Sequence, residues 1–84
     1  MSEVKVYGAD WCGDTQRVLR QLDGLNVAYD YVNVESDEQA SRWVKQQNDG
    51  KERKPTVKVG ERVLCVPSPE ELEKALRENG ALAG

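Results

Sequence analysis

Short stretches in which apolar and polar residues alternate predict four strands in this chain. These stretches are rich in β-branched and aromatic residues, as strands are. The short turn Gly60–Glu61 joins the last two of them into a β-hairpin. The predicted strands are Glu3–Tyr7, Val27–Val34, Thr56–Val59 and Arg62–Val66.

Three other segments carry apolar residues at helical spacing, which predicts amphipathic helices. The last of them has the most complete start, with Ser68 as cap, Pro69 at the first helical position and Glu71 at the third. A similar capping box is predicted at Ser36–Gln39 for the helix before it. The predicted helices run from about Gly13 to Asp23, from Ser36 to Asn48 and from Ser68 to Asn79.

The order of these elements, β-α-β-α-β-β-α, predicts an α/β fold. A strand–helix–strand unit favours parallel pairing, whereas the later hairpin forces an antiparallel pair. We therefore expect a mixed four-stranded sheet with helices on both faces. The 84 residues are enough for one domain and too few for two, so residues 1–84 are predicted to form a single domain.

Composition and charge exclude several classes of protein. Apolar residues make up 38% and charged residues 32%, a balance typical of soluble globular chains. A net charge of −3 argues against a nucleic-acid-binding module. No apolar run approaches the roughly 20 residues that a membrane span needs, and the first residues do not resemble a secretory signal. We expect a cytoplasmic monomer that binds neither nucleic acid nor membrane.

The chain contains two cysteines and no histidine. Two cysteines are too few for a disulfide scaffold or a zinc site. The lack of histidine removes Cys-His dyads, Ser-His-Asp triads and imidazole metal ligands, so no metal site is predicted. The chemistry that remains must use thiolate, carboxylate, amine or hydroxyl groups.

Cys12 is the strongest candidate for such chemistry because it follows a predicted strand and begins a predicted helix. Unpaired backbone N–H groups of the first turn, near Asp14 and Thr15, can point at its sulfur. Helix N-termini lower thiol pKa values from about 8.5 to roughly 3.5–7.5, which favours the nucleophilic thiolate. On position alone, a buried structural cysteine remains the alternative.

The segment Trp-Cys-Gly-Asp-Thr at residues 11–15 resembles the Trp-Cys-Gly-x-Cys motif of thioredoxins and some glutaredoxins. Lys54-Pro55-Thr56-Val57 stands where those proteins carry a cis-proline before their third strand. The element order is similar to the minimal thioredoxin fold of glutaredoxins, and the resemblance covers essentially the whole chain. It implies a glutaredoxin-like thiol–disulfide oxidoreductase with a thioredoxin-like βαβαββα fold.

The resemblance also implies roles for individual residues. Cys12 would be the attacking thiolate, which forms a mixed disulfide with glutathione, with a related low-molecular-weight thiol or with a substrate protein. Pro55, in the cis form, would present the backbone of Lys54 to the ligand. Trp11 would be a platform beside the sulfur or part of a packed lid. Ser68, at the start of the last helix, would bind a ligand carboxylate or be a plain N-cap. No tightly bound cofactor is implied.

The chain departs from the family pattern at several positions. Thr15 replaces the second cysteine, so the mechanism would be monothiol, with the Thr15 hydroxyl lowering the pKa of Cys12 through a hydrogen bond. Asp10 and Asp14 would raise that pKa, and Lys54 would bring a compensating cation. The segment 66–69, Val-Pro-Ser-Pro, replaces the usual Gly-Gly turn. The Cys-Gly-Phe-Ser motif of iron–sulfur-carrying glutaredoxins is absent, so no cluster is predicted.

Other features of the sequence admit two readings each. The basic residues of positions 51–62 either form a solvated hairpin surface or raise the potential beside an anionic site. Cys65 is predicted to be buried in a strand, with a distal resolving thiol as the minor alternative. For the whole protein, the alternatives to an enzyme are a catalytically weak partner-binding module and an electron-transfer partner of one reductase or peroxidase.

Overall fold

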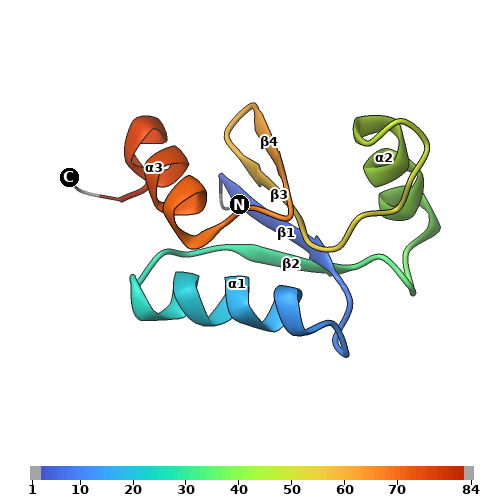
Figure 1. Cartoon of the computed structure of the whole chain (residues 1–84), viewed down its shortest axis with the longest axis horizontal. Coiled ribbons are helices and arrows are strands. Elements are labelled where there is room, and N and C mark those ends of the chain that lie inside the picture. Colours follow the sequence, from blue (N-terminus) through green and yellow to red (C-terminus); the bar gives the residue numbers. More distant parts are fainter. Residues whose placement is uncertain (1–2, 83–84) are drawn as a thin grey trace.

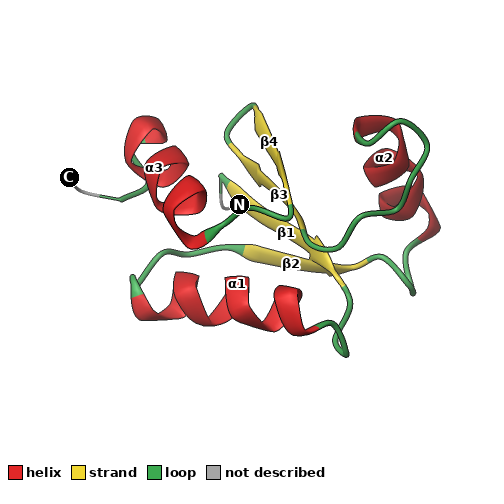
Figure 2. Cartoon of the chain, in the orientation of Figure 1, coloured by secondary structure: helices red, strands yellow, loops and turns green. Residues whose placement is uncertain are grey.

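Four strands form one mixed sheet with three helices packed around it (Figures 1 and 2). The computed structural model describes residues 3–82. The sheet order is β2-β1-β3-β4, with β2 parallel to β1 and the other pairs antiparallel. The predicted mixed sheet and element order are confirmed. The elements are β1 (Val4–Gly8), α1 (Gly13–Gly24), β2 (Asp30–Asn33), α2 (Glu38–Gln47), β3 (Thr56–Val59), β4 (Arg62–Cys65) and α3 (Pro69–Asn79).

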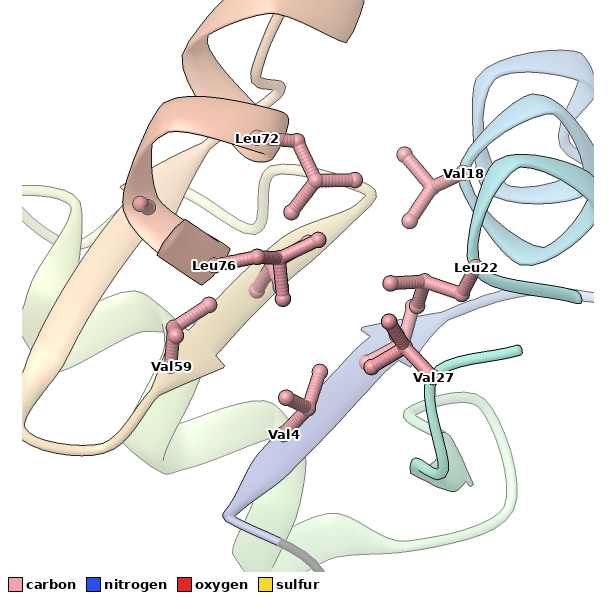
Figure 3. Close-up of a cluster of buried hydrophobic side chains, with 10 residues drawn as sticks. Val4, Val18, Leu22, Val27, Val59, Leu72 and Leu76 are labelled. Atoms are coloured by element: carbon pink, nitrogen blue, oxygen red, sulfur yellow. The ribbon is translucent and has the colours of Figure 1, made fainter. Parts of the chain in front are cut away.

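The larger apolar core lies on the face of the sheet that α1 and α3 cover (Figure 3). Leu22 of α1 and Leu72 and Leu76 of α3 are completely buried there. They pack on the side chains of β1 and β3 that alternate toward this face, Val4 and Val59 among them. Helical and strand periodicity thus converge on a single cluster.

The opposite face has a smaller cluster beneath α2, which consists of Val34, Ala40 and Val44. Tyr7 of β1 stacks on Trp43 of α2 with the ring centroids 4.6 Å apart. In Figure 1, α2 lies on the opposite side of the sheet from α1 and α3. Since one short helix serves this whole face, part of it stays open.

Cys65 occupies this open part, and the prediction that it is buried is wrong. It pairs with Thr56 across the β3–β4 ladder, and Thr56 pairs with Tyr7, so the three side chains share the α2 face. β4 is the edge strand, and the side chain of Cys65 is exposed there. The prediction placed Cys65 in the correct strand, but α2 does not cover that part of the strand.

Among the element boundaries that differ from the predicted ones, three have a clear physical cause. The second strand is shorter than Val27–Val34, because the N–H of Val27 binds the carbonyl of Leu22 rather than β1. The α2 cap is Asp37 rather than Ser36, since its carboxylate accepts the N–H of Ala40 at 3.0 Å. β4 ends before Val66, whose φ of 45° is incompatible with a strand.

The parallel pairing of β1 and β2 places the residues that follow both strands at the same end of the sheet. The antiparallel β3 begins at that end as well. Chain segments far apart in the sequence therefore meet beyond Gly8. Within residues 3–82, no helix is both long and apolar enough to cross a membrane.

Candidate active site

Cys12 occupies the N-cap position of α1, where the chain leaves β1 and enters the helix. Its backbone is extended, with φ −79° and ψ 120°, and its carbonyl accepts the N–H of Gln16 at 3.0 Å. An N-cap side chain usually accepts hydrogen bonds from the second or third helical residue. In α1 these residues are Asp14 and Thr15. The side chain of Cys12 therefore begins α1 beside the free N–H groups of its first turn.

These surroundings hold the pKa of the Cys12 thiol below its ordinary value. Burial raises the pKa, but hydrogen bonds from the Thr15 hydroxyl and from the backbone N–H groups of Thr15 and Asp14 outweigh it. The Asp14 carboxylate opposes them to a smaller extent. The expected effect of the Thr15 hydroxyl on this pKa agrees with the structure. A lowered pKa enlarges the thiolate fraction at neutral pH, which is the form that attacks disulfides.

Thr15 is held rigidly between α1 and the end of β1. Its side chain is completely buried, and its Oγ1 accepts the N–H of Ala9 at 3.4 Å, which leaves the hydroxyl proton for the sulfur. Gly8 makes room for it, because a Cβ at Gly8 would lie 2.4 Å from Oγ1 and 2.6 Å from Cγ2. The hydroxyl that serves Cys12 is thus fixed by packing.

A loop that leads into β3 lies directly beside the sulfur. The Lys54–Pro55 peptide bond is cis, as expected, and Pro55 is fully buried. The Cys12 thiol donates to the Lys54 carbonyl, with Sγ 3.8 Å from the oxygen. The carbonyl of Pro55 accepts the N–H of Val66 at 2.9 Å. Cys12, Lys54 and Pro55 therefore come together although they are far apart in the sequence.

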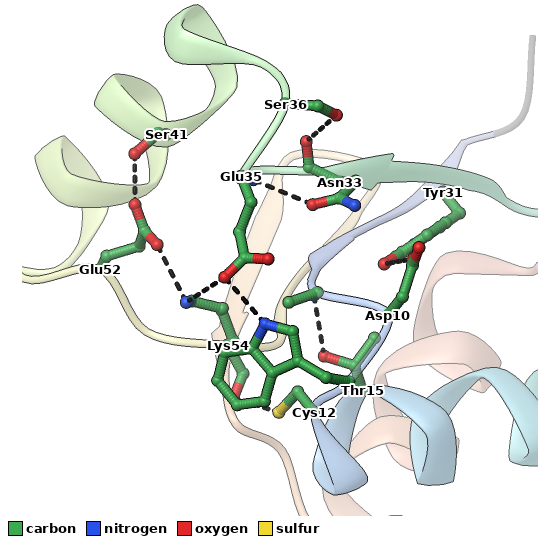
Figure 4. A network of polar contacts seen from close by, with 12 residues as sticks. Asp10, Cys12, Thr15, Tyr31, Asn33, Glu35, Ser36, Ser41, Glu52 and Lys54 are labelled. Carbon is green, nitrogen blue, oxygen red and sulfur yellow. Dashed lines mark hydrogen bonds and ion pairs between the residues drawn. The ribbon is translucent and has the colours of Figure 1, made fainter.

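The ammonium group of Lys54 is engaged by two carboxylates (Figure 4). Its Nζ lies 3.1 Å from Glu52 Oε1 and 3.8 Å from Glu35 Oε2. Ser41 of α2 donates a hydrogen bond to Glu52. The pKa of Glu52 lies below its ordinary value, first because of Ser41 and then because of Lys54. We refer to Glu35, Glu52 and Lys54 as the carboxylate–lysine cluster.

Trp11 adds an aromatic wall to the carboxylate–lysine cluster. Its indole Nε1 donates to Glu35 Oε2 at 2.8 Å, and Lys54 Nζ lies 4.9 Å from the ring centroid. Asn33, at the end of β2, fixes Glu35 by accepting its N–H at 2.9 Å. The indole is nevertheless 69% exposed beside the sulfur. The expected position of Trp11 next to Cys12 therefore agrees with the structure, and its indole N–H is bound.

Asp10 and Asp14, which were expected to raise the pKa of Cys12, have partners of their own. Tyr31 donates to Asp10 at 2.7 Å, and burial and this carboxylate together raise the pKa of Tyr31 far above its ordinary value. Arg17 Nε lies 3.5 Å from Asp14. Lys54 was expected to offset these aspartates, but its ammonium pairs with glutamates instead.

Ser68 begins α3 and is occupied by the capping box. Its hydroxyl accepts the N–H of Glu71 at 3.2 Å, and its own N–H donates to the Glu71 carboxylate at 2.9 Å. Arg17 ties the preceding loop to α1 by donating to the Pro67 carbonyl at 2.9 Å. Of the two roles considered for Ser68, the plain N-cap describes the contacts that it makes.

The comparison with known families shows to which family the chain belongs. A family model described as Glutaredoxin matches residues 4–64. The chain belongs to the glutaredoxin family. It is a glutaredoxin-like redox protein of the thioredoxin superfamily, as the motif at residues 11–15 predicted.

Individual relatives of this glutaredoxin support both sequence and fold. It is 45% identical to mycoredoxin 1 of Corynebacterium glutamicum over 58 residues, which is 69% of this chain and 71% of the relative. The glutaredoxin of Archaeoglobus fulgidus superposes with a TM-score of 0.75 at 22% identity, covering 92% of this chain and 88% of the other. A buckwheat glutaredoxin–glutathione complex gives 0.73 at 20% identity, covering 98% and 83%. The predicted thioredoxin-like, glutaredoxin-type fold is confirmed.

The structure brings Trp11, Cys12, Thr15, Lys54 and Pro55 together, while Ser68 is connected to α1 through its two chain neighbours, whose carbonyls accept hydrogen bonds from Arg17 and Gln21. Sequence reasoning missed two residues of the site, Glu35 and Glu52. Glu35 could have been found, because it follows the strand that pairs in parallel with β1. Glu52 lies in a loop whose path no pattern indicates.

Proposed function

We propose that this glutaredoxin is a thiol–disulfide oxidoreductase that works by a monothiol mechanism at Cys12. The observation that carries the proposal is the place of Cys12 at the N-cap of α1, with its sulfur 3.8 Å from the Lys54 carbonyl; the Thr15 hydroxyl and the first-turn N–H groups lower its pKa there. Cys65 supports a monothiol mechanism by its place, since its side chain faces the α2 side of an edge strand. Cys12 begins α1, which packs on the other face.

In the proposed reaction, the Cys12 thiolate attacks one sulfur of a disulfide substrate. A bond forms between Cys12 and that sulfur, the substrate disulfide breaks, and the other half leaves as a thiolate that takes a proton from water. A second low-molecular-weight thiol loses its proton to water and attacks the bound substrate sulfur; a new disulfide forms between these two sulfurs, the bond to Cys12 breaks, and Cys12 leaves as a thiolate. Glutathione or a related thiol such as mycothiol would be the co-substrate, and protein thiols would be further substrates.

The test compares the wild-type protein with Cys12→Ser and Cys65→Ser. Each is given a glutathionylated peptide and an excess of free thiol, and peptide release and protein intact mass are followed together. We expect a single thiol adduct and turnover for the wild type and Cys65→Ser, and neither for Cys12→Ser. The proposed monothiol mechanism is wrong if the Cys65→Ser protein also loses turnover, because Cys65 would then be a resolving thiol.

A second candidate function, binding of a protein partner at the same place, is favoured by two exposed apolar side chains. Trp11 is 69% and Val66 is 36% exposed. Trp11 precedes Cys12, and the N–H of Val66 donates a hydrogen bond to the carbonyl of Pro55. The two apolar residues therefore flank the Cys12 sulfur. Stable capture of a partner by Cys12→Ser, with no turnover in the wild type, would favour this function over catalysis.

A further inference from the structure

Two positively charged features could attract the carboxylates of a thiol ligand bound at Cys12, and the first is the Lys54 ammonium. The backbone carbonyl oxygen of Lys54 lies 3.8 Å from the Cys12 sulfur, so this residue borders the reacting atoms. However, its side chain is only 18% exposed and contacts Glu35 and Glu52. The carboxylate–lysine cluster therefore carries one excess negative charge.

The second group is the N-terminus of α3, where the helix dipole would favour an anion. The chain supplies the anions itself, since Glu70 and Glu71 lie in the first turn. Glu71 and Ser68 bind each other's backbone N–H groups in the capping box. Pro69, at the first helical position, has no N–H to offer. The Lys54 ammonium and the N-terminus of α3 are thus both compensated by acidic residues of the chain.

We infer that the active site discriminates among thiol partners by charge, and that Glu35 and Glu52 are the residues that set this preference. Cationic and uncharged thiols or disulfides are accepted ahead of those whose carboxylates lie close to the sulfur. The inference rests on the proposed function of Cys12 and specifies the class of its small-molecule partners. Trp11 strengthens the effect, because its indole fixes Glu35 beside the incoming ligand.

The test measures the first chemical step alone, with three disulfides that differ in charge. Cystamine is cationic, hydroxyethyl disulfide is neutral and dithiodipropionate is anionic. In each case the Cys12 thiolate bonds to one probe sulfur, and the other half leaves as a thiolate. All proteins carry Cys65→Ser, and each rate is divided by the neutral-probe rate of the same protein, which removes effects on intrinsic reactivity.

The decisive variant is Glu35→Gln/Glu52→Gln, which keeps the carbonyl acceptors for Trp11, Ser41 and Lys54. Each lost charge should change a relative rate by roughly 3-fold for a ligand charge about 6 Å away in water. We therefore expect the relative rate of dithiodipropionate to rise by roughly 3- to 10-fold, and that of cystamine to fall correspondingly.

The matched control is Glu3→Gln/Glu61→Gln, which removes the same charge at the other end of the sheet, where Gly60 binds the carbonyl of Glu3. Its relative rates should stay within about 2-fold of the wild type, since screening limits charge effects to about 10 Å at 0.1 M salt. Equal shifts in both variants would overturn the inference, because net charge would then be the cause.

Salt provides a measurement that needs no variant. In the wild type, the ratio of cystamine to dithiodipropionate rates should fall by several-fold between about 0.02 M and 1 M potassium chloride. A ratio that does not respond contradicts the inference. If adducts form on Cys12 but no second thiol releases them, the proposed turnover is wrong. The charge preference is then still tested by the ratio of the cystamine and dithiodipropionate rates. If Cys12 reacts with no probe, both are wrong.

Discussion

The two faces of the sheet are built on different principles. The face under α1 and α3 is sealed by a continuous apolar cluster, with Leu22, Leu72 and Leu76 completely buried. The face under α2 has a cluster of three buried apolar residues and one pair of stacked rings, and α2 also supplies Ser41 to the carboxylate–lysine cluster. Stability is concentrated on the first face, and the polar contacts that shape the site are concentrated between the edge of the sheet and α2.

The largest expected effect is a loss of stability when the larger cluster is opened. Leu76→Ala should lower the free energy of unfolding by about 2–5 kcal/mol, because it leaves a cavity among fully packed side chains. Val44→Ala under α2 should cost about 1–2 kcal/mol, since it removes fewer methyl groups. Urea unfolding of both variants checks this order, and a larger loss for Val44→Ala would contradict the comparison of the two faces.

The next effect concerns the thiol itself. Thr15→Val removes the hydroxyl that stabilises the thiolate, so the pKa of Cys12 should rise toward the ordinary value of a cysteine. Alkylation reaches its plateau only above that pKa, so the rate profile should shift to higher pH and the rate at pH 7 should fall. Iodoacetamide kinetics from pH 5 to 10, in a Cys65→Ser background, measure it.

The control for this shift is Thr15→Ser, which keeps the hydroxyl and should retain the low midpoint. Thr15→Val also leaves the N–H of Ala9 without its acceptor, which should cost about 1–3 kcal/mol of stability. If Thr15→Val and wild type share one midpoint, the first-turn N–H groups alone account for the lowered pKa.

A smaller effect is expected from removing the cation of the carboxylate–lysine cluster. Lys54→Met leaves the Glu35 and Glu52 carboxylates without the cation that they share, which should lower the free energy of unfolding by about 1 kcal/mol. Lys54→Arg should keep most of that stability. Urea unfolding monitored by tryptophan fluorescence tests both, and an unchanged Lys54→Met would mean that the ion pairs contribute nothing measurable.

The smallest effect is expected at Arg17, which faces the carboxylate that opposes the thiolate. Arg17→Met leaves the Asp14 carboxylate without its ion pair, so the pKa of Cys12 should rise slightly. Arg17→Lys should preserve the midpoint because it restores the charge. Alkylation profiles at low and high salt distinguish this Coulombic effect, since added salt should erase the difference between Arg17→Met and wild type.

Features that depend on local chemistry could be predicted from the sequence. The start of α3 follows from Ser68, Pro69 and Glu71, which by themselves account for the backbone N–H groups at the start of the helix. The place of Cys12 at the start of α1 follows from one strand and one helix pattern. The exposure of Cys65 did not follow, because it depends on how far α2 reaches across the sheet, which no strand pattern records.

The partners of Lys54 show the same limit within the site. Its basic neighbourhood in the sequence suggested an excess of positive charge, whereas folding brings Glu35 from the β2–α2 connection and Glu52 from its own loop. Long-range pairing therefore gives the Lys54 ammonium two carboxylate partners. The parallel alignment of β1 and β2 makes the contribution of Glu35 predictable in principle.

The contact between Gly8 and Thr15 makes these two positions epistatic. With threonine at position 15, any side chain at position 8 would collide with Oγ1 and Cγ2. A smaller residue at position 15 relaxes that constraint but also gives up the threonine methyl group that fills the space over Gly8. The order in which the two positions change therefore matters: substitution at position 15 can come first, whereas substitution at position 8 cannot.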